Sequence, residues 1–377
     1  MTSLLLAWSL IAGVWWGIAL LLVHFPRRSK NLSISSFSKT SDIHLSIFKP
    51  TPPLTERDRL DSWKKSIESF LSQMGPTHEM LLGILPRDIP SWQPTLDHWK
   101  KTYPQVSLKI ISDLPEKQYP NPKIAWNKTL SLHAKGEFWL WSDLDITVPP
   151  HYLSTILREY SGNPDEYLTN AYTIPSIENA PGLLDALFVN VEFFPGVLLL
   201  DRLHLFKTAF GAGILFSPAL FSDLKKWDHL GCSIGDDFEL SRFFQKGTLS
   251  STLVSTSVPK NSFGDSLRHY QRWHKTIRWC DPIGYLGLIL LFPLLGALVS
   301  SLWNPLHLLS VALLWIMEIG IGYLLLQKTA PQINSSSLGY LILWPWIRPL
   351  TWIHSWLPLS VQWGRTYWNK PNKNPLL

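Results

Sequence analysis

The stretch FWLWSDLDITVPP, residues 138–150, decides how the rest of the chain is interpreted. An apolar run of strand length, FWLW, is followed directly by Ser142, Asp143, Leu144 and Asp145, and a pair of prolines ends the segment. This pattern predicts a buried strand that delivers two carboxylates to the edge of a sheet. Because residues two apart in an extended chain point to the same side, Asp143 and Asp145 can bind one object.

A hard divalent cation such as Mg or Mn that carries a diphosphate is the ligand that two such carboxylates favour. These ions take carboxylate oxygens and keep open positions for phosphate. The competing interpretation is an ordinary turn, in which the two Asp residues precede a helix at 151–160 and cap it. An isolated Asp-x-Asp is more often such a turn, so the assignment depends on residues elsewhere in the chain.

Strands and helices alternate before the Asp-x-Asp segment. Strands are predicted at 43–48, 80–85 and 106–111, and helices at 57–74, 92–103 and 124–134. This alternation predicts an α/β fold with a mostly parallel sheet, helices on both faces, and ligands beyond the carboxyl ends of the strands. Asp88 follows the second strand, where a nucleotide base or ribose would lie, and Lys123 begins the third helix, where a cation could meet phosphate. A turn Asp and a surface Lys are the alternatives.

Two later segments carry small and acidic residues. Gly211, in the run FGAG, would let the backbone approach a sugar, or it simply forms a tight turn. Asp236 and Asp237 follow a Gly-flanked loop and precede a helical pattern, so they could cap that helix. In a site that holds a diphosphate, one of the two would instead be the general base that removes the proton of an acceptor hydroxyl.

Residues 266–279, SLRHYQRWHKTIRW, have the pattern of a helix. Spacings of three and four place His269, Arg272, Trp273 and Thr276 on one face. That face offers a hydrogen-bond donor, a fixed cation and a flat ring, which suit a leaving diphosphate and an acceptor. The alternative is a basic amphipathic helix on lipid headgroups, and both interpretations can hold together.

Hydrophobic runs predict a membrane protein. Residues 4–23 are uncharged and about 20 residues long, and the basic cluster at 27–30 follows, so we expect an N-terminal anchor with the next part of the chain in the cytosol. Residues 283–303 and 305–326 predict a transmembrane hairpin. Residues 338–359 are apolar but interrupted by prolines and an arginine, which favours an interfacial or re-entrant segment.

The composition restricts the partners. The 377 residues carry a net charge of +6, which fits an anionic membrane surface or an anionic nucleotide; without a dense basic run, nucleic acid is not expected. The two cysteines have no zinc spacing and form no disulfide framework, so we expect free thiols.

Together these residues resemble the ceramide glucosyltransferase family of membrane-bound nucleotide-sugar glycosyltransferases. The matching pieces follow the family's order over residues 43–290: Phe48-Lys49-Pro50, Asp88, Asn121-Pro122-Lys123, SDLDITV at 142–148, FPGV at 194–197, Asp236-Asp237-Phe238, and His269 to Trp273. The segment RHYQRWHKTIRWCDPIGYLG at 268–287 is most similar to the bacterial hopanoid-biosynthesis branch, which attaches N-acetylglucosamine to a polyol-bearing hopanoid lipid.

The resemblance implies a GT-A-like, inverting, metal-dependent enzyme that moves N-acetylglucosamine or glucose from a UDP-sugar to a hydroxyl of a membrane lipid. A hopanoid polyol is the acceptor that it favours, with ceramide or another sphingolipid or glycerolipid as the alternative. It implies the bacterial inner membrane as the location, with the catalytic domain facing the cytosol. The residues are also compatible with a polysaccharide synthase of the same fold and with a non-catalytic membrane scaffold.

The resemblance also implies residue roles. Asp143 and Asp145 would bind the metal and the diphosphate, and Asp237 would act as the base. His269, Arg272 and Trp273 would take the place of the family's signature, which is glutamine or arginine, then arginine, then tryptophan. Asp88 would contact the uridine, and the other expected substrate-binding residues are Lys49, Lys123, Gly211 and Asp236. Three positions depart from the family's usual residues, namely Trp126, Gly213 and Asp236, where Asn, Thr and Glu are usual.

Six segments are expected along the chain. They are an N-terminal transmembrane anchor at 1–26, a tether at 27–42, a cytosolic glycosyltransferase domain at 43–265, an amphipathic catalytic helix at 266–282, a transmembrane hairpin at 283–328, and an interfacial or re-entrant segment with a cytosolic tail at 329–377.

Overall fold

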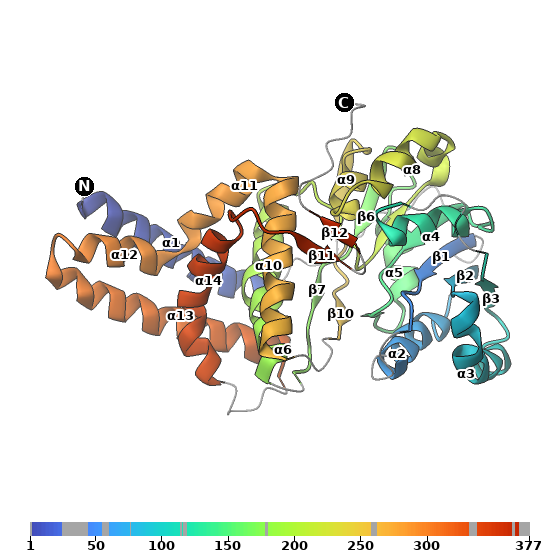
Figure 1. Ribbon diagram of the computed structural model, residues 1–377, viewed down its shortest axis with the longest axis horizontal. Helices are drawn as coiled ribbons and strands as arrows, with labels where there is room; N and C mark the ends of the chain where they lie inside the picture. The colour runs from blue at the N-terminus through green and yellow to red at the C-terminus, as the bar shows by residue number, and fades with distance from the viewer. Residues whose placement is uncertain are drawn as a thin grey trace. The chain divides into compact units, whose positions relative to one another are not determined.

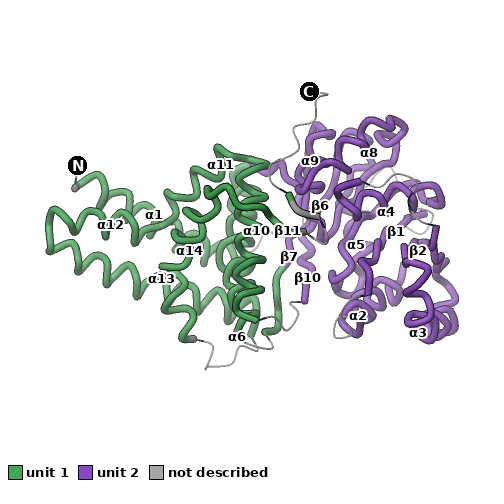
Figure 2. The backbone as a smooth tube through the Cα atoms, viewed as in Figure 1, with its two compact units in different colours: residues 1–26, 173–204, 258–371 green, residues 27–172, 205–257, 372–377 purple. Residues whose placement is uncertain are grey.

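A computed structural model of the chain divides it into two compact units (Figure 2). Unit 1 comprises residues 1–26, 173–204 and 258–371, and unit 2 comprises residues 27–172, 205–257 and 372–377. The structure describes residues 2–24, 44–54, 60–75, 77–113, 115, 119–177, 180–257, 262–331, 338–363 and 366–368. The predicted tether at 27–42 and the end of the predicted tail lie outside these residues.

Unit 2 is built on a seven-stranded sheet (Figure 1). Its strands lie in the order β3-β2-β1-β4-β8-β6-β9. They are β1 (His44–Pro50), β2 (Thr77–Gly83), β3 (Ser107–Ile111), β4 (Phe138–Trp141), β6 (Glu166–Thr169), β8 (Ile214–Phe216) and β9 (Lys246–Leu249). Strand β1 pairs in parallel with β2 and β4, β2 with β3, and β6 with β9, whereas β8 is antiparallel to both of its neighbours.

Helices cover both faces of this sheet because successive side chains of its strands point to opposite sides. In β1, Leu45 and Ile47 pack in one core cluster and Phe48 packs in the other. The first cluster contains residues of α2 (Leu60–Leu71), α3 (Ile89–Thr102) and α5 (Tyr152–Glu159); the second contains residues of α4 (Pro122–Ser131), α8 (Leu224–Gly231) and α9 (Asp236–Ser241). The predicted α/β fold with a mostly parallel sheet covered on both faces is confirmed.

The direction of the strands decides which loops meet. The carboxyl ends of the parallel strands β1, β2 and β4 lie at one edge of the sheet, and the amino end of the antiparallel β8 lies at the same edge. The segments after β2 and β4 and the Gly-rich segment before β8 therefore share one side of the sheet. The chain that follows β4 forms the short strand β5 (Ile146–Thr147), which pairs antiparallel with β10 (Val254–Thr256).

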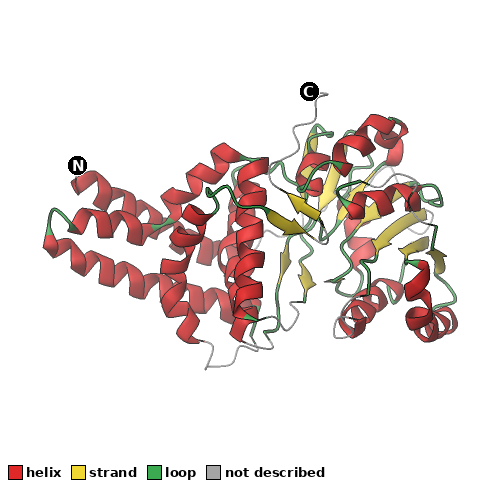
Figure 3. Cartoon of the chain, in the orientation of Figure 1, coloured by secondary structure: helices red, strands yellow, loops and turns green. Residues whose placement is uncertain are grey.

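Unit 1 is mostly helical (Figure 3). Its elements are α1 (Thr2–His24), α6 (Ala180–Ala186), the π-helix η4 (Leu187–Phe193), α7 (Phe194–Arg202), α10 (Phe263–Cys280), α11 (Pro282–Gly287), η6 (Leu288–Leu291), α12 (Pro293–Ser301), η7 (Pro305–His307), α13 (Leu308–Thr329), α14 (Leu338–His354), β11 (Val361–Trp363) and β12 (Thr366–Trp368). The strand β7 (Tyr172–Thr173) and the 3-10 helices η3 (Pro86–Asp88) and η5 (Pro218–Ser222) complete the elements named here.

Three helical segments of the described chain are long and apolar enough to cross a membrane: Ser3–His24, Pro181–Arg202 and Pro305–Thr329. The first and third match the predicted anchor and the second arm of the predicted hairpin. The first arm, predicted at 283–303, is instead a pair of helices, Pro282–Leu291 and Pro293–Ser301, bent by 61°. Pro293 stands at the break, where its ring fixes φ and it has no N–H to donate.

The segment Pro181–Arg202 was not predicted as a span, and residues 173–204 belong to unit 1 rather than continuing the domain expected at 43–265. Asp185 and Glu192 interrupt its apolar run, which is why its composition did not resemble a membrane segment. Helix α14 runs through Pro345 and Pro349 over 17 residues, a length at the lower limit for a crossing.

A buried ion cluster holds the helices of unit 1 together. The Arg348 guanidinium on α14 lies 2.6 Å from a Glu318 oxygen on α13 and 3.1 Å from a Glu192 oxygen on η4. It also lies over the rings of Trp16 and Phe292, at 4.6 and 5.3 Å from their centroids. Because a charge away from water is costly unless it is paired, this arrangement fixes how the helices pack. Cys232 and Cys280 are not joined in a disulfide.

Candidate active site

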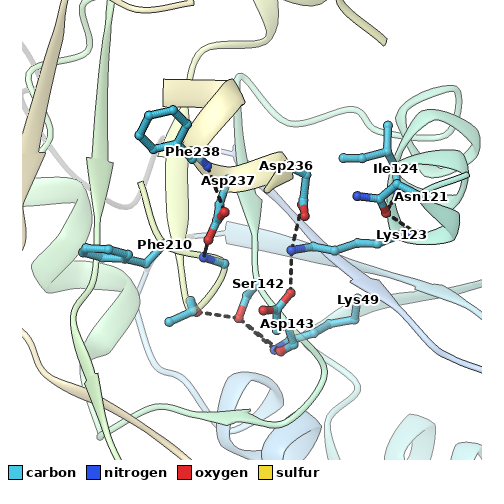
Figure 4. A network of polar contacts seen from close by, with 12 residues as sticks. Lys49, Asn121, Lys123, Ile124, Ser142, Asp143, Phe210, Asp236, Asp237 and Phe238 are labelled. Carbon is cyan, nitrogen blue, oxygen red and sulfur yellow. Dashed lines mark hydrogen bonds and ion pairs between the residues drawn. The ribbon is translucent and has the colours of Figure 1, made fainter. Parts of the chain in front are cut away.

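The turn after β4 carries Asp143 and is tied to the segment before β8 (Figure 4). The Asp143 N–H donates to the Gly211 carbonyl at 2.8 Å, and the Ser142 hydroxyl donates to the Ala212 carbonyl at 2.9 Å. These bonds pair two loops that are about 70 residues apart in the chain, as the separation of Ser142 from Ala212 shows. The carboxylate of Asp143 is 41% exposed and available for a ligand.

Lys49, at the end of β1, supports this turn from inside the protein. Its side chain is fully buried, and its ammonium donates to the Ser142 hydroxyl at 3.0 Å and to the Asp143 carbonyl at 2.7 Å. The ammonium also lies 3.9 Å from the centroid of the Phe70 ring. Burial lowers the pKa of Lys49 to about 7, against the opposing effect of the Asp143 and Asp145 charges. Its donors are directed at the turn itself.

Lys123 joins two of the predicted acidic motifs. Its ammonium lies 2.6 Å from an Asp143 oxygen and 3.0 Å from an Asp236 oxygen. Burial alone would lower the pKa of Lys123, but the charges of Asp143, Asp236 and Asp237 outweigh it and raise this pKa well above its usual value. A permanent cation therefore lies between the segments at 143 and 236.

The start of α4 places Lys123. The Asn121 side chain caps the helix by accepting from the Lys123 and Ile124 N–H groups at 3.0 and 3.3 Å. Its amide donates to the Ser233 carbonyl at 3.0 Å, in the loop that precedes Asp236. One side chain thus positions both the cation and the loop that it pairs with.

Asp237, at the start of α9, is held by two backbone donors. One carboxylate oxygen accepts from the Gly211 N–H at 3.1 Å, and the other accepts from the Phe238 N–H at 2.8 Å. Burial, followed by the charge of Asp236, raises the pKa of Asp237 to about 6, while Lys123 opposes the rise. A carboxylate with this pKa is ionised at neutral pH and still basic enough to accept a proton.

Gly211 connects the Asp-x-Asp turn to the start of α9. Its carbonyl accepts from the Asp143 N–H, and its own N–H donates to the Asp237 carboxylate. A Cβ on this residue would lie 2.5 Å from an Asp143 carboxylate oxygen and 3.0 Å from the Lys123 ammonium. No side chain fits there without displacing one of these groups. The glycine is required by close approach of charged side chains and not by a positive φ.

Asp145, the second carboxylate of the Asp-x-Asp motif, accepts from the Thr256 hydroxyl of β10 at 2.9 Å. Burial, followed by the negative charge of Asp143, raises the pKa of Asp145. Thr256 was not predicted from the sequence, because it lies far from every motif and approaches Asp145 only through the pairing of β10 with β5.

The two carboxylates fit a hard divalent cation by their donor type. Within the described ranges, no set of three His, Cys, Asp or Glu side chains is arranged to hold a metal. Mg²⁺ bound with a nucleotide commonly takes one or two protein carboxylates and completes its shell with phosphate oxygens and water. The mutual repulsion of Asp143 and Asp145, which contributes to the raised pKa of Asp145, is what such a cation would relieve.

Asp88 lies after β2, at the same edge of the sheet as the Asp-x-Asp turn. It is 7% exposed and accepts from the Leu54 N–H at 3.1 Å, and the Arg87 guanidinium is 3.8 Å away. Strand β1 separates β2 from β4 in the sheet, so Asp88 is two strands from Asp143. This carboxylate orders the chain that leaves β1.

The three predicted residues of the amphipathic helix belong to unit 1. Helix α10 begins with a capping box between Ser262 and Asp265 and carries His269, Arg272 and Trp273. The ring centroids of His269 and Trp273 lie 4.1 Å apart. His269 contacts Asp185 of α6, with 2.9 Å between its Nδ1 and a carboxylate oxygen, and Asp185 was not predicted as a site residue.

Two of the departures from the family pattern have local explanations. Trp126 packs against Gly83, where a Cβ would lie 2.7 Å from the indole, so the large ring occupies space that the glycine leaves open. A Cβ at Gly213 would lie 2.7 Å from both the Asn170 amide oxygen and the Tyr152 hydroxyl, which hydrogen-bond each other at 2.8 Å. A threonine at 213 would clash with this pair.

Comparisons with known proteins give one family match and several structural neighbours. The family model described as "Glycosyl transferase family 21" matches residues 15–372. Among solved structures, the mannosyltransferase PcManGT from Pyrobaculum calidifontis in complex with GDP-Man and Mn2+ is 13% identical, with 92% of this chain and 99% of that chain covered and a TM-score of 0.45.

The structure of S. aureus TarS 1-349 in complex with UDP-GlcNAc is 15% identical, with 83% of this chain and 89% of that chain covered and a TM-score of 0.37. No curated protein matches the sequence.

Proposed function

The chain belongs to glycosyl transferase family 21, and from this premise we propose that it is an inverting enzyme that moves a sugar from a UDP-sugar to a hydroxyl of a membrane lipid. The observation that supports the proposal best is the cluster in unit 2, in which Lys123 lies between Asp143 and Asp236 while Asp237 binds the Gly211 N–H. Such a cluster can hold a diphosphate beside a base.

Asp143 and Asp145 are the residues that would hold a divalent cation, Mg or Mn. When bound, the cation neutralises the charge that develops on the diphosphate as the bond to the sugar breaks. Lys123 adds a permanent positive charge to the same region, and its displacement from Asp143 by a metal would leave it available for phosphate oxygens. Lys49 acts on the donor indirectly, by fixing the turn that carries Asp143.

Asp237 is the proposed base. As the acceptor oxygen attacks the anomeric carbon, its proton passes to the Asp237 carboxylate, the bond between that carbon and the diphosphate oxygen breaks, and UDP leaves with the electron pair. Attack opposite to the leaving group inverts the configuration. The pKa of about 6 leaves Asp237 ionised at neutral pH, as this role requires.

The remaining predicted residues take supporting roles in this proposal. Asp88 contacts the uridine, and the Gly211 backbone together with Asp236 and Lys123 shapes the diphosphate and sugar region. For His269, Arg272 and Trp273 of α10 we propose the roles implied by the family resemblance, a hydrogen-bonding group and a cation for the leaving diphosphate and a ring for the acceptor.

The donor sugar we propose is N-acetylglucosamine or glucose, and the acceptor is a hopanoid polyol of the bacterial inner membrane. Support comes from the segment at 268–287, which is most similar to that branch, and from the candidate membrane spans of unit 1. The basic cluster that follows α1 favours a cytosolic location for the catalytic unit. Lipid mass spectrometry of cells with and without the protein tests the sugar and the acceptor together.

Two variants test the chemistry. Asp143→Asn should abolish Mn-dependent UDP binding in isothermal titration and abolish transfer, whereas Asp237→Asn should bind UDP with Mn normally and stop transfer. Asp97→Asn, an exposed residue of α3 that accepts from Gln93, is the matched control and should behave as wild type. Unchanged UDP and Mn binding by Asp143→Asn would reject the metal assignment, and a wild-type protein that binds no UDP would reject the function.

A further inference from the structure

We propose that Asp185 is a positioning residue that fixes the orientation and the protonation of His269. The inference rests on the proposed function, because it assumes that His269 takes part in sugar transfer. It concerns two residues of unit 1 that are 84 positions apart in the sequence, on α6 and α10. Nothing in the sequence pattern around Asp185 distinguishes it from an ordinary polar interruption of an apolar helix.

The contact has the geometry of a carboxylate–imidazole pair. One Asp185 oxygen lies 2.9 Å from Nδ1 of His269, and the Asp185 side chain is fully buried. Its second oxygen is buried and has no hydrogen-bond partner among the described residues. A buried carboxylate is stable only where a donor or a cation compensates it, so Asp185 depends on His269.

The pair determines what the imidazole can do. A carboxylate on Nδ1 keeps the proton on that nitrogen in the neutral ring, and it also stabilises the doubly protonated cation. The chemistry of His269 toward a substrate then goes through Nε2. Because Asp185 is buried beneath the ring, it acts through His269 and does not contact the substrate itself.

Neighbouring contacts hold the same ring from other sides. The His269 ring lies against Trp273. The Trp273 ring in turn stacks on Phe188, with 4.8 Å between the ring centroids and 23° between the ring planes. Further along, Tyr270 donates to Glu192 at 3.4 Å. The segment that contains Asp185, Phe188 and Glu192 thus contacts α10 at spacings of three and four residues, which is one face of a helix.

Other charged groups lie on and around α10. Besides Asp185 and His269, the titratable or charged side chains on α10 and on the described elements that pack against it are Asp265, Arg268, Tyr270, Arg272, His274, Lys275, Arg278, Cys280, Asp281, Tyr285, Glu192, Tyr340, Arg348 and His354. Glu192 is directed at Tyr270 and Arg348, and His274 lies 2.8 Å from the Tyr285 hydroxyl. Asp185 contacts the His269 ring directly, with 2.9 Å between one of its oxygens and Nδ1.

The first test compares Asp185→Asn with wild type. We expect kcat to fall about 10–100-fold, the range seen when the carboxylate partner of a metal-bound histidine is removed, while the KM for the UDP-sugar stays within about twofold, because the imidazole loses the group that fixes its tautomer and orientation. The pKa of His269, followed by NMR of histidine-labelled protein and assigned with His269→Gln, should fall by about one unit because the cation loses its carboxylate. This readout needs no turnover.

The control is Glu192→Gln, on the same helical segment and against the same helix. It removes the negative charge that lies 3.1 Å from the Arg348 guanidinium, and it should lower thermal stability without moving the pKa of His269. If Asp185→Asn also lowers stability and leaves the pKa of His269 unchanged, Asp185 is only structural and the inference is wrong.

A double-mutant cycle separates the inference from the function. In a His269→Gln background, Asp185→Asn should cause no further loss of kcat, since Asp185 acts through the histidine. An additional tenfold loss in that background would overturn the inference while leaving the proposed function intact. If wild type transfers no sugar at all, the proposed function fails, and the NMR titration still decides whether Asp185 controls the ionisation of His269.

Discussion

At the scale of single residues, the ionisation of Asp237 predicts how activity depends on pH. Its carboxylate must be ionised to accept a proton, and burial and the charge of Asp236 raise the pKa of Asp237 to about 6. We therefore expect kcat/KM to be constant above pH 7 and to fall about tenfold per pH unit below pH 6. The measurement is a pH–rate profile of wild type, and a profile with no acidic limb between pH 5 and 7 would contradict the assignment.

The same shift predicts an effect on stability of the opposite sign. Because the folded pKa of Asp237 exceeds the ordinary value of 3.8, the folded state binds more protons than the unfolded state between about pH 4 and 6, so wild type loses stability as pH rises through this range. Asp237→Asn, which carries no charge, should have a higher Tm than wild type at pH 7.5, with the difference shrinking toward pH 4. Asp97→Asn serves as the control, since that side chain is exposed.

The sequence predicted the acidic residues of this site but not all their partners. Asp143, Asp145, Asp236 and Asp237 follow apolar or Gly-flanked segments, so their positions at strand ends and helix starts could be predicted. The joint role of Gly211 and the buried position of Lys49 depend on distances between loops, which no local pattern reports. Thr256 and Asp185 come close to their partners only through tertiary packing.

At the scale of elements, the strand and helix order of unit 2 up to α5 could be predicted because each element carries its own apolar period. The antiparallel β8 could not, since three residues have too little pattern to show direction. Yet β8 is what brings Gly211 to the carboxyl edge of the parallel strands. The bend at Pro293 is a similar case, because composition alone described one continuous apolar run.

The amino end of α4 gives the prediction at this scale. Asn121→Ala removes the cap of α4 and the bond to the Ser233 carbonyl, so it should lower stability by about 1 kcal/mol and weaken UDP binding by displacing Lys123 and the loop before Asp236. Thermal unfolding and isothermal titration with UDP and Mn measure the two effects.

The matched control is Asp223→Ala, which removes the cap of α8, where the side chain accepts from the Lys225 N–H. It should lower stability by a similar amount and leave UDP binding unchanged. If both variants bind UDP as wild type does, Asn121 has no role beyond capping.

At the scale of the whole molecule, the chain does not divide into consecutive domains. Residues 173–204 leave the α/β unit, join the helices of unit 1, and are followed by a return to unit 2 at 205–257. The sequence predicted a single domain at 43–265 because the partners of this excursion, α1, α10 and α13, lie far away in the chain. These partners explain why the apolar segment contains the acidic residues Asp185 and Glu192, since each of the two contacts a residue of α10.

This organisation gives α1 a role beyond attachment to the membrane. Trp16 is 3% exposed, lies over the Arg348 guanidinium and donates to the Leu291 carbonyl at 3.3 Å, and Trp8 donates to the Leu290 carbonyl at 3.0 Å. Replacing Thr2–His24 with an unrelated Leu and Ala span of equal length should keep the protein in the membrane fraction. The Tm of unit 1 should fall, because Arg348 loses a stacking partner of about 1–2 kcal/mol together with the two indole hydrogen bonds.

Restoring Trp8, Ser9 and Trp16 in the artificial span is the control. Ser9 is included because it packs against Gly296 of α12, where its hydroxyl would lie 2.5 Å from an added Cβ. That variant should recover most of the lost Tm, whereas UDP and Mn binding, a property of unit 2, should be unchanged in both. A fully artificial span with the wild-type Tm would mean that α1 is only an anchor, since a helix that contributes specific packing cannot be replaced by an arbitrary apolar sequence without cost.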